Sequence, residues 1–405
     1  MLVGWVVEEH NEAKQNIGKE VVGIVFANGG MWKEQRSLSI AILKSFGMGK
    51  SSLAHKISEE VNVYLDTLAA LDGKPEDVRS LTGTSVSNVI CSIVIGKRFE
   101  YEDPLFKSFV DSFSRQIAAF DNAWPVVVWP WLRFIPGNFL GTKTMNNCVQ
   151  IIRKEFGDKF IELALKEDGE DAAPTFITSY LKEMEKAQKE GKDTTLSMEQ
   201  LRVNIQQLVV AGTDTTSNTI MWFMVYLLHY PHVQNKVYQE ICSVTGPDRE
   251  PDIQDKVKLP YTNAVIMETQ RLASILPQSV PHYCKAETII QGYTIPAGTT
   301  VLPSLDSVLM DEETWEEPLK FRPERFLHEG RVVKPDAFIP FSTGPRICMA
   351  EALANMELFL YTTSLVKRFE LLPCTTGQLP SRHPEDGMVS SPLPFKLRFL
   401  ERSTP

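Results

Sequence analysis

The sequence predicts a mainly helical protein with a small β region. Most of its 405 residues fit a helical pattern, and 43% of them are hydrophobic, enough for a large core. Short β-branched runs between turn residues occur at 288–301, and a further β region is expected around 395–399. No internal repeat or low-complexity linker divides the chain, so we expect residues 1–405 to form a single domain.

The composition excludes several classes of function. The net charge is −9 and the pI about 5.5, which gives no electrostatic support for binding nucleic acid. The six cysteines are scattered without a C-x-x-C pair, so reduced thiols in a cytosol-facing protein are expected rather than a zinc site or a disulfide framework. No signal peptide or N-terminal membrane span is recognised, and the longest apolar run, 220–228, is too short to cross a bilayer.

A long helix is predicted to follow Ser197 and to end before Pro231. Ser197 and Gln200 match the capping box that opens a helix. The middle of this helix, 211–216, reads Ala-Gly-Thr-Asp-Thr-Thr, where glycine costs about 1 kcal/mol relative to alanine and threonine competes for backbone carbonyls. A helix weakened at one point often has a use for that point. Taken alone, Asp214 is more simply a group that caps or solvates a helix defect.

Other elements are predicted by local signals. Glu268 and Arg271 are three residues apart on a helix opened by Pro260, so their charges lie on one face. The runs 288–290, 293–295 and 299–301 predict a small meander. The charge-dense stretch 165–193 is expected to be a solvated connection between helices.

Cys348 is the residue with the clearest chemical implication. It directly precedes an apolar helical stretch, and a helix N-terminus favours thiolate over thiol. A thiolate in such a place can bind haem iron. Gly344 allows a tight turn before it, and Arg346 offers a fixed cation for a carboxylate. For Cys348 by itself, a buried structural cysteine is an equally good interpretation.

Residues 341–348, Phe-Ser-Thr-Gly-Pro-Arg-Ile-Cys, resemble the Phe-x-x-Gly-x-Arg-x-Cys haem-binding loop of the cytochrome P450 family. The family's E-x-x-R and Pro-Glu-Arg-Phe motifs precede it in the expected order, at 268–271 and 323–326. The resemblance runs from about Gly23 to the C-terminus and favours the animal microsomal, drug- and steroid-oxidising branch. It implies that branch's fold, a triangular helical prism enclosing haem, here with the N-terminal anchor and first sheet strands missing. Ala350 departs from the pattern, since the family usually has glycine there.

The resemblance also implies roles for individual residues. Cys348 would be the metal ligand of haem b, and Asp214 with Thr215 would be the catalytic acid–alcohol pair that relays protons to dioxygen. Other residues that the resemblance places at the cofactor are Trp32, Arg36, Ala211, His282, Phe341 and Arg346. Glu268, Arg271 and Arg325 would form a structural lock. Without this context, His282 is better interpreted as a turn or surface histidine.

The implied function is that of a haem-thiolate monooxygenase, which inserts one oxygen atom from O₂ into a small lipophilic substrate such as a steroid, fatty acid or xenobiotic. Electrons would come from NADPH through NADPH–cytochrome P450 reductase, with cytochrome b5 as a further candidate partner. Two alternatives stay open: a haem-thiolate isomerase or dehydratase, which the Asp214–Thr215 pair argues against, and a truncated chain that is non-catalytic or deficient in haem.

The family's location is the cytosolic face of the endoplasmic reticulum membrane. Three tryptophans in 124–132 would either touch the membrane surface there or pack into the core.

Overall fold

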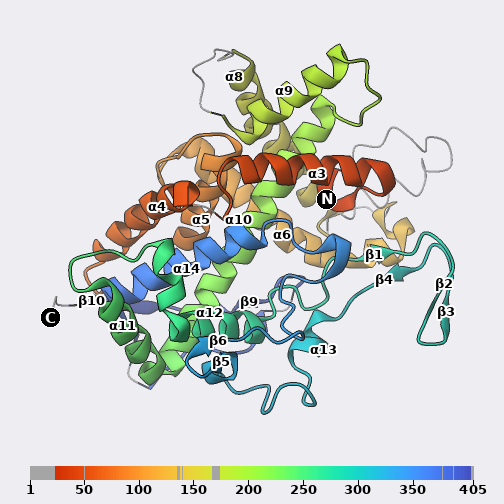
Figure 1. Ribbon diagram of the computed structural model, residues 1–405. Helices are drawn as coiled ribbons and strands as arrows, with labels where there is room; N and C mark the ends of the chain where they lie inside the picture. Colours follow the sequence, from red (N-terminus) through yellow and green to blue (C-terminus); the bar gives the residue numbers. More distant parts are fainter. Residues whose placement is uncertain are drawn as a thin grey trace. The chain divides into compact units, whose positions relative to one another are not determined.

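The structure, a computed structural model, describes residues 23–49, 51–134, 137–138, 140–166, 174–375, 377–385 and 387–402 (Figure 1). The chain divides into two compact units, one made of residues up to 60 together with 80–214, the other of 61–79 together with the residues from 215 onward. Helices dominate both units, and the strands of the described residues all lie in the second. The prediction of a mainly helical protein with a small β region is therefore confirmed.

The first unit is helical. Two helices, α4 (Ser51–Ala69) and α10 (Met198–His229), run from one unit into the other. The remaining elements of the first unit are α2 (Gly23–Phe26), α3 (Gly29–Ser45), α5 (Arg79–Val94), α6 (Pro104–Val128), η1 (Pro130–Phe134), α7 (Thr142–Gln150), the π-helical turn η2 (Ile151–Asp158), α8 (Lys159–Lys166) and α9 (Phe176–Lys189). Its core includes a group of stacked and tilted rings from α6, η2 and neighbouring residues: Phe99, Phe106, Phe109, Phe156 and Phe160.

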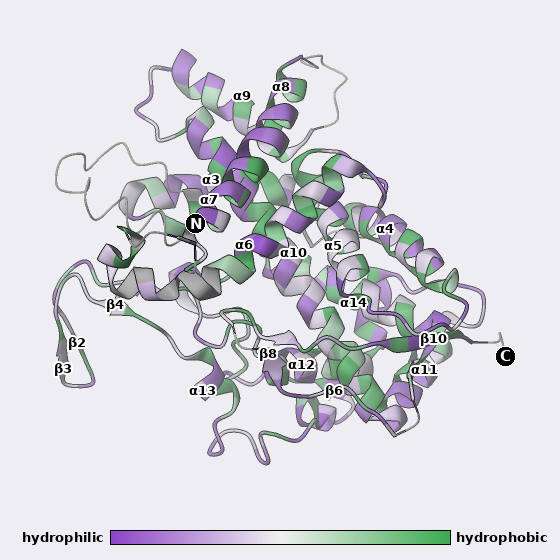
Figure 2. Ribbon diagram, turned by 180° about the vertical axis from the view of Figure 1, so that it is seen from behind, coloured by the Kyte–Doolittle hydropathy of each residue, from purple (hydrophilic) through white to green (hydrophobic). Residues whose placement is uncertain are grey.

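Helix α9 lies inside the stretch that was expected to be a solvated connection. That expectation is wrong for this part of the stretch, because Thr175 caps the helix and its hydroxyl accepts from the Thr178 N–H at 3.1 Å. Phe176, Ile177 and Tyr180 are buried on one side of it. The other side carries the charged residues that colour α9 mostly purple in Figure 2. Residues 167–173 of the same stretch lie outside the described part.

Helix α10 begins and ends as the sequence predicts. The Gln200 N–H donates to Ser197 Oγ at 3.2 Å, and Pro231 opens the next helix. The predicted weak middle stays regular helix. Gly212 faces α5 so closely that a Cβ there would lie 2.7 Å from Ile90 Cδ1, so the glycine permits close helix packing.

The second unit holds the remaining helices and five antiparallel pairs of strands. Its helical elements are α11 (Pro231–Thr245), η3 (Ile253–Lys258), α12 (Pro260–Ala273), α13 (Leu305–Leu309), η4 (Pro323–Phe326), η5 (Gly344–Arg346) and α14 (Glu351–Arg368). Its strand pairs are β1 (His282–Tyr283) with β4 (Thr300–Val301), β2 (Thr288–Ile290) with β3 (Tyr293–Ile295), β5 (Leu327–His328) with β6 (Arg331–Val332), β7 (Phe369–Pro373) with β10 (Leu397–Glu401), and β8 (Pro384–Glu385) with β9 (Ser391–Pro392).

The pairing of strands differs in one place from the predicted meander. Strands β2 and β3 form the expected hairpin, with Ile290 opposite Tyr293. Strand β4 does not continue that sheet, and its Val301 instead pairs with His282 of β1. Turn residues at 296–298 predicted a reversal correctly, but they do not determine which strand the returning chain pairs with. The C-terminal β region is β10, slightly later in the chain than expected.

No helix within the described ranges is long and apolar enough to cross a membrane.

Candidate functional site

Cys348 lies on a closed loop between η5 and α14. Its backbone N–H donates to Phe341 O at 3.0 Å, and the Ile347 N–H donates to Gly344 O at 3.1 Å. Ser342 and Gly344 have positive φ angles of 65° and 75°, so the backbone does need the turn predicted at the glycine. The Cys348 side chain is exposed. The loop therefore leaves Cys348 accessible, and the alternative of a buried structural cysteine does not apply.

The helix that follows supports the thiol electrostatically. Ala350 is the N-cap of α14, and its carbonyl accepts the Ala354 N–H at 2.9 Å. Cys348 thus stands just before the first turn of an 18-residue helix, where the dipole favours negative charge. Arg346 precedes it in the same loop and is half-buried. The loop brings a thiol and a guanidinium into one short segment.

A buried ionic network ties α12 to η4. Arg271 donates to both oxygens of Glu268, through Nε at 2.8 Å and Nη2 at 2.9 Å. Arg325 donates through Nε to Glu268 Oε1 at 3.0 Å. The backbone N–H of Arg322 reaches the same oxygen at 2.9 Å. The structure therefore brings together the three residues that the resemblance assigned to a lock.

The Arg271 side chain is saturated by further acceptors. Its Nη1 donates to Leu309 O at 2.8 Å and its Nη2 to Pro318 O at 2.7 Å. Its guanidinium carbon lies 5.2 Å from the centre of the Trp315 ring. Buried charges are tolerated when they are paired and hydrogen-bonded in this way. The network holds the segment from α12 to η4 in the second unit.

The predicted acid–alcohol pair lies on consecutive residues of α10. Asp214 and Thr215 are half-buried, and Ala211, one turn earlier, is exposed. The Thr219 hydroxyl donates to Thr215 O at 2.8 Å. The boundary between the two units falls between Asp214 and Thr215.

Sequence reasoning missed a buried acid that faces this helix. Glu357 of α14 is 1% exposed, and neither carboxyl oxygen has a hydrogen-bond partner of acceptable geometry among the described residues. Burial raises the pKa of Glu357 well above its usual range, and the neighbouring Thr216 hydroxyl opposes that shift. A lone acid inside the apolar stretch that follows Cys348 was the signal that could have revealed it.

Trp32 and Arg36 lie one helical turn apart on α3. The Arg36 guanidinium carbon is 5.9 Å from the centre of the Trp32 ring, and both side chains are half-buried. An indole N–H and a guanidinium are therefore presented together, as their spacing predicts. His282 lies in strand β1 of the second unit and is exposed.

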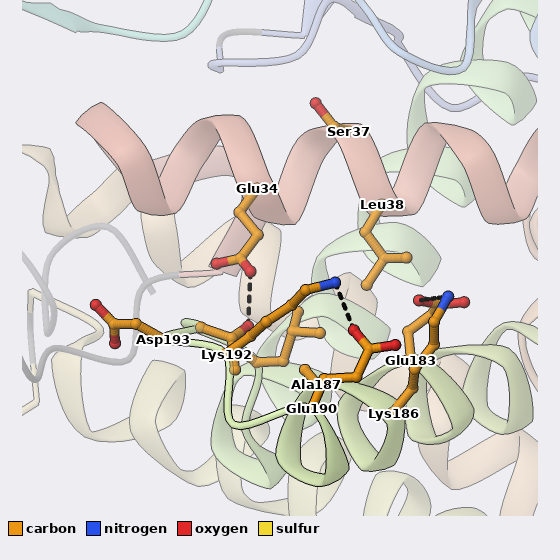
Figure 3. Close-up of a pocket in the computed structure, with 11 residues that line it drawn as sticks. Glu34, Ser37, Leu38, Glu183, Lys186, Ala187, Glu190, Lys192 and Asp193 are labelled. Atoms are coloured by element: carbon orange, nitrogen blue, oxygen red, sulfur yellow. Dashed lines mark hydrogen bonds and ion pairs between the residues drawn. The ribbon is translucent and has the colours of Figure 1, made fainter.

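A pocket of about 300 Å³ in the first unit lies between α3 and α9 (Figure 3). Its lining is rich in charged side chains, and Figure 3 shows Lys192 turned to Glu190 and Lys186 to Glu183, both as ion pairs. Such a lining does not suit a lipophilic ligand. None of the predicted site residues lines it.

Comparison with known proteins decides the family. The family model for cytochrome P450 matches residues 7–399. The chain belongs to the cytochrome P450 family. It is 36% identical over 391 residues to cytochrome P450 2U1 of Bos taurus, an alignment that covers 94% of this chain and 70% of the relative. It is 38% identical over 394 residues to cytochrome P450 2D26 of Rattus norvegicus, covering 95% and 77%, and 40% identical over 381 residues to cytochrome P450 2K4 of Oncorhynchus mykiss, covering 92% and 72%.

Membership of the P450 family confirms the prediction of a haem-dependent oxidoreductase. The loop around Cys348 fits that cofactor. The exposed thiol offers a thiolate for iron, and Arg346 offers a cation for a carboxylate. A Cβ on Gly344 would meet no atom within 4 Å, so no described residue fills the space beside this turn.

Proposed function

We propose that the chain is a monooxygenase that inserts one atom of O₂ into a small lipophilic substrate, namely a steroid, a fatty acid or a xenobiotic. The observation that supports it is the exposed Cys348 thiol, held at the start of α14 by the Cys348–Phe341 backbone hydrogen bond of 3.0 Å. Substrate RH, O₂, NADPH and a proton give ROH, water and NADP⁺. Haem b bound at Cys348 would supply the iron centre at which dioxygen is reduced.

The chain's own residues would bind the cofactor and move protons. Two carboxylates of the cofactor would be held by donors from Trp32, Arg36, His282 and Arg346, and Phe341 would pack beside Cys348. The small side chain of Ala211 would leave space for O₂. The Asp214 carboxyl would take protons from solvent and pass them to the Thr215 hydroxyl, which would donate them toward dioxygen.

We further propose that both units belong to one catalytic domain covering residues 1–405, because α4 and α10 each run through both. Glu268, Arg271 and Arg325 would stabilise this domain and take no part in the chemistry. Electrons would come from NADPH–cytochrome P450 reductase, with cytochrome b5 as a second donor.

The proposed location is the cytosolic face of the endoplasmic reticulum membrane. Trp129, Trp131 and Phe134, at the end of α6 and in η1, are 54%, 63% and 73% exposed. Large aromatic rings so exposed suit a membrane interface better than a core. This favours membrane contact over core packing for the part of 124–132 whose side chains are described. The side chain of Trp124 lies outside the described ones.

The test is a spectrum of the full chain after titration with haem, reduction and exposure to CO. The enzyme should give the absorption band of a thiolate-ligated haem, and Cys348→Ser should abolish it. Cys374→Ser, at a half-buried cysteine of the same unit, is the matched control and should keep the band.

Two other results would favour the alternatives. A wild-type chain without the thiolate band would indicate a non-catalytic or haem-deficient product. A thiolate band without NADPH-dependent O₂ uptake in the presence of reductase would indicate an isomerase or dehydratase.

A further inference from the structure

The first two turns of α3 carry Trp32 and Arg36, and no apolar side chain of these turns is fully buried. The fully buried residues of this helix are Gln35, Ser39, Ile42 and Leu43, so the apolar contacts lie in its second half. Asn28, at the N-cap, makes no side-chain capping bond to the helix and donates instead to Phe26 O at 3.4 Å. In most helices an apolar face provides the tertiary anchor. Here the buried residue nearest Trp32 and Arg36 is an amide, Gln35.

Gln35 uses its full hydrogen-bonding capacity. Its Nε2 donates to Thr195 O at 3.1 Å and to Thr195 Oγ1 at 3.0 Å. Its Oε1 accepts from the Tyr180 hydroxyl at 3.1 Å and from Asn204 Nδ2 at 2.8 Å. A side-chain amide has two donor hydrogens and two acceptor sites, and all four are engaged. The side chain is 0% exposed, so each bond forms away from competing water.

The partners of Gln35 come from three different places in the first unit. Tyr180 lies on α9, Asn204 on α10 and Thr195 in the segment between these helices. Burial raises the pKa of Tyr180 to about 12, so its hydroxyl stays protonated and remains a donor to Gln35. Figure 3 shows α3 above this region, with Glu34 pointing toward the connection that follows α9.

Glu34 reinforces the attachment from the neighbouring position. Its carboxylate accepts from the Thr195 N–H at 2.8 Å and from the hydroxyls of Thr194 and Thr195, each at 2.6 Å. Burial raises the pKa of Glu34, but these hydrogen bonds outweigh it and the pKa lies below its usual range. The carboxylate therefore stays charged at neutral pH and keeps Thr195 in place for Gln35.

Asn204 extends the attachment to the chain before α3. Its Oδ1 accepts from the Ile24 N–H at 3.0 Å while its Nδ2 donates to Gln35. Gln200 and Gln207, on the same side of α10, accept from the N–H groups of Gly23 and Val25, each at 2.9 Å. Amides at i, i+4 and i+7 thus cap α2, and one of them also fixes α3.

We infer that Gln35 is a positioning residue. Its four hydrogen bonds fix the position of the first two turns of α3 against α9 and α10, and also their rotation about the helix axis. Trp32 and Arg36 would thereby be held in the orientation that binds the cofactor's carboxylates. The inference rests on the proposed function only in assigning that target; the attachment of the helix is a property of the protein alone.

The first experiment measures hydrogen exchange on the haem-free full chain. Gln35→Leu keeps the volume but removes all four bonds. Amides of 29–37 should then exchange about tenfold faster or more, since each lost buried hydrogen bond is worth roughly a factor of ten. Amides of 40–45, next to the apolar contacts of Ile42 and Leu43, should change far less. Tyr180→Phe and Thr195→Val, which each remove part of the set, should give smaller effects in the same segment.

The second experiment measures the rate at which haem leaves the loaded protein for an excess of a haem-scavenging apoprotein. Gln35→Leu should release haem about tenfold faster than wild type, in line with the loosened donors. The matched control is Gln234→Leu. Gln234 is a buried amide of the second unit that exchanges two bonds with the backbone of Leu371, at 2.7 and 3.2 Å. If Gln234→Leu lowers the melting temperature about as much as Gln35→Leu does, its rate of haem release should still stay within about twofold of the wild-type rate.

Two results would overturn the inference. One is unchanged exchange of 29–37 in haem-free Gln35→Leu, which would show that other contacts hold the helix. The other is equal haem release in Gln35→Leu and Gln234→Leu at equal melting temperature, which would reduce Gln35 to a general stabiliser. Failure of the proposed function is separate, because it would appear as a wild-type chain without the thiolate band while the exchange experiment still decides whether Gln35 fixes α3.

Discussion

Arg325 in η4 donates a 3.0 Å hydrogen bond through Nε to Glu268 in α12, a residue 57 positions earlier in the chain. The two side chains are 5% and 0% exposed. The Glu268 carboxylate is shared by the guanidinium groups of Arg325 and Arg271. The attraction between these opposite charges offsets the cost of removing each of them from water.

Glu268→Gln should therefore destabilise the protein by about 3–5 kcal/mol, because it leaves two buried guanidinium groups without a counter-charge. The measurement is urea unfolding of the full chain. Glu316→Gln is the control, since Glu316 pairs with Arg322 at a side-chain exposure of 77% and surface pairs contribute about 0–1 kcal/mol. Equal effects of the two substitutions would show that the network does not hold α12 and η4 together.

Gly212→Ala should have opposite effects in two backgrounds. In the wild type the new Cβ would stand 2.7 and 2.8 Å from Ile90 Cδ1 and Cγ1, and overpacking costs about 1–3 kcal/mol. In an Ile90→Ala background the obstructing atoms are gone, and the better helix propensity of alanine should stabilise by up to about 1 kcal/mol. The test is the free energy of unfolding of four proteins: the wild type, Gly212→Ala, Ile90→Ala and the double variant. The same sign in both backgrounds would refute the close contact between α5 and α10.

Glu357→Gln should flatten the dependence of stability on pH. Between the unfolded pKa of glutamate, about 4.3, and the raised pKa of native Glu357, the native state binds one proton more than the unfolded state. The free energy of unfolding therefore falls as the pH rises, by up to about 1.4 kcal/mol per pH unit. The amide cannot ionise and should abolish this slope in the pH range that begins above the unfolded pKa.

Chemical unfolding at several pH values measures the effect, and Glu370→Gln, at an exposed position of β7, should leave the slope unchanged. A Glu357→Gln protein with the wild-type slope would mean that Glu357 is ionised in the native state.

Trp131→Ala combined with Phe134→Ala should weaken binding to lipid vesicles without lowering stability, because these rings are 63% and 73% exposed. A loss of about tenfold in partitioning is expected if both rings enter the interface. Sedimentation with vesicles of neutral phospholipid provides the measurement. Leu319→Ala, at a similarly exposed apolar residue, is the control. If the control loses as much binding, or the double variant loses none, the membrane contact is not made by η1.

Local signals in the sequence were sufficient where the cause of a structure is itself local. Ser197 and Pro231 mark the ends of α10 because capping and the missing proline N–H act within one turn. Gly344 has the positive φ that its turn needs, and Phe341 and Cys348 close the loop within eight residues. The motifs in that loop also sufficed to indicate the family, and hence haem.

Contacts between distant segments were decided by tertiary structure alone. Strand β4 pairs with β1 instead of β3, because turn residues reverse the chain without choosing the partner strand. Thr175 starts a helix in a stretch whose charges indicated only exposure, since one buried face is enough to order α9. In the sequence, Gln35 is one polar residue between Trp32 and Arg36, and Glu357 is one acid in an apolar helix. Gln35 binds Asn204, which is 169 positions later in the chain, and Glu357 lies beside Thr216, which is more than 100 positions earlier. Patterns among sequence neighbours do not predict contacts between residues so far apart.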